Sequence, residues 1–212
     1  MSDLFKELET YVREKLSAAD AGHDWWHAVR VRNNALIISD KEGGNPKIIK
    51  TAALVHDLVD DKFFDPVLAE KELKEKLEQT GFSDDETTHV LNIVNHISFS
   101  KEIDGNNFDT LEFRIVQDAD RLDAIGAIGI ARTFSYGGHK RREFYDPDIP
   151  PAEHLSKEGY RNSTAPTINH FYEKLLKLKD MMKTPTGKQM AEERHKFMEQ
   201  FLEQFFREWG GK

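Results

Sequence analysis

The stretch ALVHDLVDD at residues 53–61 sets one histidine and three carboxylates into an otherwise apolar run. At helical spacing, His56 and Asp60 fall on the same face as Ile49. Burying a carboxylate on an apolar face is costly unless a cation or several hydrogen-bond donors satisfy it. We therefore predict that this stretch belongs to a buried helix whose polar groups surround a divalent ion.

Two more predicted helices carry the same combination of residues. One begins after Asp24, whose side chain can cap the first free amide groups, and carries His27. The other, over about residues 115–127, sets Asp120 among apolar neighbours such as Val116. Because the chain has no cysteine, an ion must be bound by histidine, carboxylate and water, which suit hard or borderline divalent metals.

Each of these residues, taken alone, also has an ordinary structural interpretation. A single histidine such as His27 is more often hydrogen-bonded in a core than bound to a metal. The acids at 60–61 and at 118–123 could lie on solvated helix faces. Three helices that each bring such groups to an apolar face favour convergence on an ion instead.

Amphipathic periodicity and capping signals recur along the chain, and no strand pattern stands out. Asn45-Pro46, Asp65-Pro66 and the capping box from Ser83 to Glu86 predict helix starts. We predict an all-α fold, with helices at about residues 3–18, 24–42, 46–60, 66–80, 84–96 and 115–127, and further helices within 165–209.

The length of 212 residues suits one substantial core. We expect a single domain over 1–212, with a core at about 20–130 and a C-terminal helical extension at about 165–209. The net charge of −8 argues against a dedicated nucleic-acid surface and against docking on an anionic membrane, although a local basic pocket could bind a small polyanion. No apolar run approaches the roughly 20 residues of a membrane span, and no signal peptide is apparent. A cytoplasmic monomer or homodimer is expected.

His27, the pair His56-Asp57 and Asp120 resemble the H…HD…D signature of the HD-domain metal-dependent phosphohydrolases. The chain is most similar to a bacterial subfamily of small HD hydrolases, in the segments GHDWWH at 22–27, ALVHD at 53–57, QDADRLDAIG at 117–126 and HFYEKL at 170–175. The resemblance implies an all-α fold and one divalent metal ion, Mn²⁺ first and Mg²⁺, Ni²⁺ or Fe²⁺ as alternatives. It also implies a ligand set of His27, His56, Asp57 and Asp120.

Relatives of this kind hydrolyse nucleoside triphosphates to a monophosphate and pyrophosphate, so a small nucleotide is the expected partner. The resemblance and the helical spacing together assign further roles. Asp60 or Asp61 is expected to act as the general base, and His23 and Asp118 are expected to support the ligands. Arg30, Lys62 and His96 are close in sequence to proposed site residues or lie on a helix expected to face them, and His170 and Lys174 share one helical face. These five side chains are expected to bind the substrate.

Three other functions stay open at this point. The site could belong to another HD phosphatase or phosphodiesterase, of the nucleotidase or guanosine-tetraphosphate type. It could be a di-iron oxygenase centre, in which His23 or His96 would supply an additional ligand. It could also be a non-catalytic module that senses a nucleotide, although the full set of ligands argues against a degenerate site.

Overall fold

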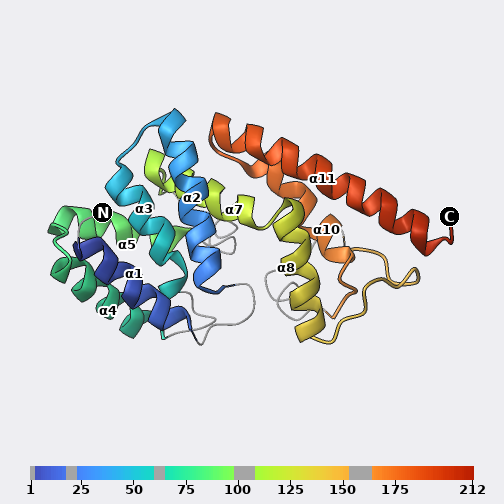
Figure 1. Cartoon of the computed structure of the whole chain (residues 1–212), viewed down its shortest axis with the longest axis horizontal. Helices are drawn as coiled ribbons and strands as arrows, with labels where there is room; N and C mark the ends of the chain where they lie inside the picture. The colour runs from blue at the N-terminus through green and yellow to red at the C-terminus, as the bar shows by residue number, and fades with distance from the viewer. Residues whose placement is uncertain (1–2, 18–22, 60–64, 98–107, 153–163) are drawn as a thin grey trace. The chain divides into compact units, whose positions relative to one another are not determined.

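The described part of the chain comprises residues 3–17, 23–59, 65–97, 108–152 and 164–212. In the computed structural model these residues form helices and turns, with no β-strand among them (Figure 1). The predicted all-α fold is confirmed. The chain forms two compact units, Met1–Asp120 and Arg121–Lys212, and each is considered by itself. The expectation of one domain over 1–212 stays a prediction.

The first unit is built from short helices joined at capped turns. Its elements are α1 (Asp3–Leu16), α2 (Trp25–Glu42), α3 (Pro46–Val55), the 3₁₀ helix η1 (His56–Val59), α4 (Pro66–Gln79), α5 (Asp84–His96) and most of α7 (Leu111–Asp123). The predicted starts are confirmed, because Asn45 caps α3, Asp65 caps α4, and Ser83 and Glu86 form a capping box on α5.

Helix α3 lies in the core of this unit, where it packs against α2 and α5. Seven of its ten residues are buried, which a helix this apolar requires. Leu54 and Ile49 are among the largest side chains that are almost fully buried. The element that precedes the HD dipeptide is therefore held by apolar contacts on most of its surface.

Two predicted helices end earlier than expected. Helix α3 stops at Val55 instead of reaching Asp60, and the chain continues as the tighter 3₁₀ helix η1. At this point Nδ1 of His56 donates a hydrogen bond to the backbone carbonyl of Ala53. Helix α7 stops at Asp123, and a new helix begins at Gly126, whose φ of 72° is left-handed and cannot continue an α-helix. Ala127 therefore does not share a helix with Asp120.

The second unit contains α8 (Gly126–His139), α10 (Asn169–Glu173), the 3₁₀ helix η2 (Leu175–Met181) and α11 (Pro185–Trp209). Helix α11 packs against α8 and η2. The rings of Phe134, Phe171 and Phe201 contact one another with centroids 5.8 to 6.3 Å apart, which gives this unit an aromatic core. Among the described helices of the whole chain, none has the length and apolar character to cross a bilayer.

Candidate metal centre

Three elements of the first unit bring four predicted ligands together. Helix α2 supplies His27 in its first turn, η1 supplies His56 and Asp57, and α7 supplies Asp120. The start of α2 is fixed by Asp24, whose Oδ1 accepts the backbone N–H of His27 at 2.8 Å. The cap therefore sets the backbone position of the first ligand.

The donor atoms of these side chains face a common point. The Nε2 atoms of His27 and His56 are 3.2 Å apart. The Asp57 carboxylate lies 3.4 Å from Nε2 of His27 and 3.3 Å from Nε2 of His56. Oδ1 of Asp120 lies 3.5 and 3.7 Å from the same two nitrogens. His27, His56 and Asp120 have the spacing of a three-ligand metal group.

The His56 ring is held in the form that a metal requires. Its Nδ1 is 2.9 Å from the carbonyl oxygen of Ala53, which can only accept a hydrogen bond, so Nδ1 carries the proton. In the neutral ring, Nε2 then presents its lone pair toward the other donor atoms. The same hydrogen bond that ends α3 therefore orients a ligand.

Asp57 is ionised although it is buried. Burial alone would raise its pKa, but positive charge on His56, the hydrogen bond and charge of His23, and positive charge on His27 hold the pKa of Asp57 well below its usual range. A cation bound among neutral histidines would act on Asp57 in the same direction. The side chains of His27 and His56 are 1% and 3% exposed, whereas that of Asp120 is 36% exposed. The centre is thus closed on the histidine side and open toward Asp120.

These residues fit a divalent ion. Ligand atoms about 2.1 Å from one ion lie about 3.0 Å apart as octahedral neighbours and about 3.4 Å apart in a tetrahedron. The observed separations of 3.2 to 3.7 Å are close to these values. Lone pairs and carboxylates that face one another at this distance repel unless a cation lies among them. Two imidazoles with two carboxylates suit Mn²⁺, Fe²⁺, Ni²⁺ or Zn²⁺ by ligand type.

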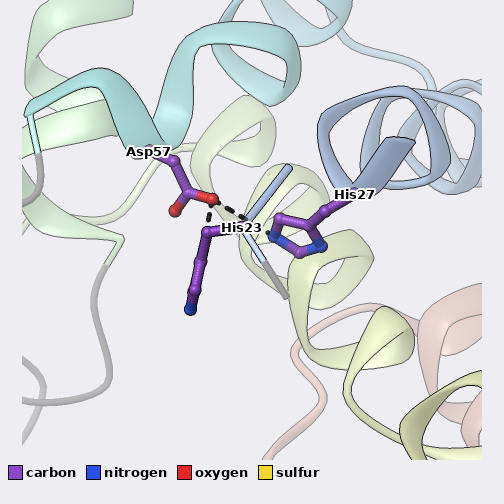
Figure 2. Close-up of side chains that lie close together, drawn as sticks. All are labelled: His23, His27 and Asp57. Atoms are coloured by element: carbon purple, nitrogen blue, oxygen red, sulfur yellow. Dashed lines mark hydrogen bonds and ion pairs between the residues drawn. The ribbon is translucent and has the colours of Figure 1, made fainter. Parts of the chain in front are cut away.

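His23 lies beside the centre and contacts its carboxylate. Figure 2 shows the rings of His23 and His27 directed at one oxygen of Asp57, which is 3.0 Å from Nδ1 of His23. The other oxygen of Asp57 faces His56. His23, His27 and Asp57 also satisfy the spacing of a metal group, so His23 lies either next to an ion or one step behind it.

For the other site residues predicted from the sequence in the first unit, no contact with the four ligands is described. Asp60, Asp61 and Lys62 lie outside the described residues. Arg30 is half-buried on α2, and Asp118 is fully buried on α7. His96 ends α5, where its Nδ1 donates to the carbonyl of Asn92 at 2.7 Å and its ring stacks on Phe108. Their predicted roles stay predictions.

His170 and Lys174 belong to the second unit. Burial, with smaller contributions from Lys174 and Arg142, lowers the pKa of His170 to about 3. The ring is therefore neutral at physiological pH. Sequence reasoning did not single out Arg142 as a neighbour of His170, although the run of cations from His139 to Arg142 was a visible signal.

Comparisons with known proteins agree with this geometry. The HD domain family matches residues 25–125, a range that contains all four candidate ligands. Uncharacterised protein YpgQ of Bacillus subtilis is 39% identical, with 94% of this chain and 90% of that protein aligned. The crystal structure of an HD-superfamily hydrolase from Bacillus thuringiensis is 45% identical, with 98% of this chain and 97% of that one covered and a TM-score of 0.77.

A crystal structure of YpgQ in complex with ADP covers 96% of each chain at 37% identity, with a TM-score of 0.76. The matches extend over nearly the whole chain and are well above the identity at which only a fold is shared. On this similarity and on the H…HD…D residues that the structure gathers, the chain belongs to the HD superfamily.

Proposed function

We propose that this protein is a divalent-metal-dependent phosphohydrolase that cleaves nucleoside triphosphates to a monophosphate and pyrophosphate, with Mn²⁺ as its metal. The observation that carries the proposal is the convergence of His27, His56, Asp57 and Asp120 within metal-binding distance of one another. HD-superfamily relatives described as hydrolases support the reaction class.

Two further facts support a nucleotide as the substrate. YpgQ, a relative over nearly the full length, has been crystallised with ADP. The sequence also resembles the bacterial subfamily whose members release pyrophosphate. Cleavage at the α-phosphorus rests on this resemblance, and it is the part of the proposal that needs its own test.

The protein's own groups would hold the reactants and move protons. A divalent ion bound by the four ligands would supply Lewis acidity, which neutralises phosphate charge and makes water a stronger acid. The hydrogen bond from His56 to Ala53 keeps that ring in the ligating form. The exposed side of the centre at Asp120 leaves access for a phosphate.

We propose that Asp60 or Asp61 accepts the proton of the attacking water, and that Arg30, Lys62 and His96 contact the phosphate chain. Asp61→Asn should lower kcat by about 10²–10⁴-fold if this carboxylate is the base, because an amide keeps the shape but cannot take a proton. Metal content should stay unchanged. If Asp61→Asn retains full kcat while Asp60→Asn loses it, Asp60 is the base.

Hydrolysis in ¹⁸O-labelled water tests the reaction. Attack at the α-phosphorus places the label in the nucleoside monophosphate, and mass spectrometry of both products shows where it is. Label in orthophosphate or pyrophosphate alone would place the attack at another phosphorus and would replace the pyrophosphohydrolase assignment by a different phosphatase activity.

A further inference from the structure

Helix α7 ends in a buried acid that is not one of the four candidate ligands. Asp123 is the last residue of α7, three positions after Asp120, and its side chain is 2% exposed. Among the described residues, the two groups with metal-binding spacing do not include it. A carboxylate at the C-terminal end of a helix lies at the negative end of the helix dipole. A buried acid in this position therefore needs a cation or several hydrogen-bond donors.

Arg132 of α8 supplies that cation. Its Nη1 donates to Oδ2 of Asp123 at 2.8 Å and to the backbone carbonyl of the same residue at 3.1 Å. One guanidinium group therefore neutralises the carboxylate and also caps a carbonyl at the end of the helix, where intrahelical partners run out. Both residues belong to the second unit, Arg121–Lys212.

Two other arginines attach the same turn of α7. Arg194 of α11 donates from Nη1 to the carbonyl of Leu122 at 2.5 Å, and Arg121 donates to the carbonyl of Met181 in η2. A Cβ atom added at Gly126 would lie 3.0 Å from Cβ and Cγ of Arg194, so the stem of this arginine lies directly on the turn after α7. Each of the last three residues of α7 is thus tied to another element.

This anchoring matters to the metal centre because Asp120 directly precedes the anchored residues. Helix ends fray when their last carbonyls have no partners. A frayed last turn would carry the Asp120 carboxylate away from His27 and His56, whose Nε2 atoms now lie 3.5 and 3.7 Å from its Oδ1. The side chain of Asp120 is 36% exposed, so packing around it restrains it little and the helix backbone must fix its position.

We propose that Arg132 is a positioning residue for the metal ligand Asp120, and that it acts through its two hydrogen bonds to Asp123. This inference rests on the metal centre of the proposed function. It does not depend on the proposed reaction, because metal binding can be measured without any nucleotide.

Titration calorimetry with Mn²⁺ tests this role in the full chain after treatment with chelator and desalting. Arg132→Gln should still bind one ion but about 10- to 100-fold more weakly than wild type, because the ligand is loosened and not removed. Arg132→Lys should bind within about threefold of wild type, since an ammonium group has three donors and can bond to both oxygens of Asp123. A wild-type affinity in Arg132→Gln would overturn the positioning role.

A double variant separates positioning of Asp120 from a general loss of structure. Asp120→Ala leaves three ligands and should bind Mn²⁺ more weakly by itself. If Arg132 acts through Asp120, adding Arg132→Gln to Asp120→Ala should weaken binding by less than about threefold further, because nothing remains to be positioned. The full 10- to 100-fold loss in this background would mean that Arg132 supports the fold in general, and it would overturn the proposal.

Arg114→Gln is the matched control, since it breaks an arginine–aspartate pair at the other end of α7. Nε of Arg114 donates to the exposed Asp109 at 2.6 Å, and the variant should keep Mn²⁺ affinity within about twofold. If Arg132→Gln does not reach the wild-type circular dichroism spectrum, Asp123→Asn replaces it, with a loss in the same direction expected. Wild-type protein that binds no Mn²⁺ would overturn the metal centre itself, whereas absence of hydrolysis would leave these affinities unchanged.

Discussion

The two units of this protein use histidine in opposite surroundings. In Met1–Asp120, His27 and His56 face the carboxylates of Asp57 and Asp120 at 3.3 to 3.7 Å. In Arg121–Lys212, burial lowers the pKa of His170 to about 3, with smaller contributions from the charges of Lys174 and Arg142. Carboxylates and imidazole lone pairs that face one another favour a bound cation, whereas a buried neutral imidazole near cations does not. The surroundings, and not the histidine itself, decide whether a group can bind a cation.

Removing a carboxylate from the first group should have the largest effect. Asp57→Asn should reduce hydrolysis by on the order of 10³-fold, since the metal's charge stabilisation amounts to several kcal/mol and each 1.4 kcal/mol is tenfold. Steady-state rates with Mn²⁺ and a nucleoside triphosphate measure the loss. Asp85→Asn, an exposed acid on α5, is the control and should keep the wild-type rate. A wild-type rate in Asp57→Asn would remove this residue from the centre.

His23 should tune the metal without being indispensable to it. If its hydrogen bond orients Asp57, His23→Ala should weaken Mn²⁺ affinity by about 10- to 100-fold while one ion still binds. Calorimetric titration with Mn²⁺ gives both affinity and stoichiometry. A stoichiometry that falls to zero would instead make His23 a ligand, and an unchanged affinity would leave it with no role there.

In the second unit, α8 packs so closely against Thr167 that a side chain at position 137 has no room. Gly137→Ala should destabilise the protein by about 1–3 kcal/mol, because the added methyl group meets Thr167. Gly138→Ala is a matched control, since a Cβ there has nothing within 4 Å, and alanine should be tolerated or mildly stabilising in the helix. Urea denaturation of both variants gives the comparison. Equal stability of the two would contradict the close packing.

A smaller effect is expected from His170 on how the free energy of unfolding depends on pH. The unfolded His170 takes up a proton near its ordinary pKa of 6.5, whereas in the folded chain its pKa is about 3. The unfolded state therefore binds more protons between these values, and stability falls as the pH falls through that range, by at most about 1.4 kcal/mol per pH unit. His170→Asn should make the loss between pH 6.5 and 5.5 less steep in chemical denaturation. An unchanged slope would mean that the ring is protonated normally.

Much of the fold followed from local rules in the sequence. Capping residues such as Asn45 and Ser83 act over three or four positions, so their helix starts were predictable. The ends of α3 and α7 were not, since they depend on the His56 ring contacting a backbone carbonyl and on the left-handed conformation of Gly126. Periodicity alone carries neither kind of information.

The metal centre and the surroundings of His170 differ in the same way. His27, His56 and Asp120 could be selected because carboxylate and imidazole on apolar helix faces are anomalous wherever they occur. The neighbourhood of Arg142 could not be selected, because backbone pairing of residues 143–144 with 167–168 brings it to His170 across a long stretch of chain. Surface cations are too common for a run of them to reveal which buried residue lies near it.

The metal content of His56→Ala is the most direct test of the centre. Wild-type protein reconstituted with Mn²⁺ and desalted should hold one equivalent of manganese by elemental analysis. His56→Ala should retain less than about a tenth of that amount, because it loses one of four ligands on the buried side of the centre. His89→Ala, which changes a histidine of the same unit that contacts Thr110 and Glu112, should hold a full equivalent. A full equivalent of manganese in His56→Ala would contradict the ligand set.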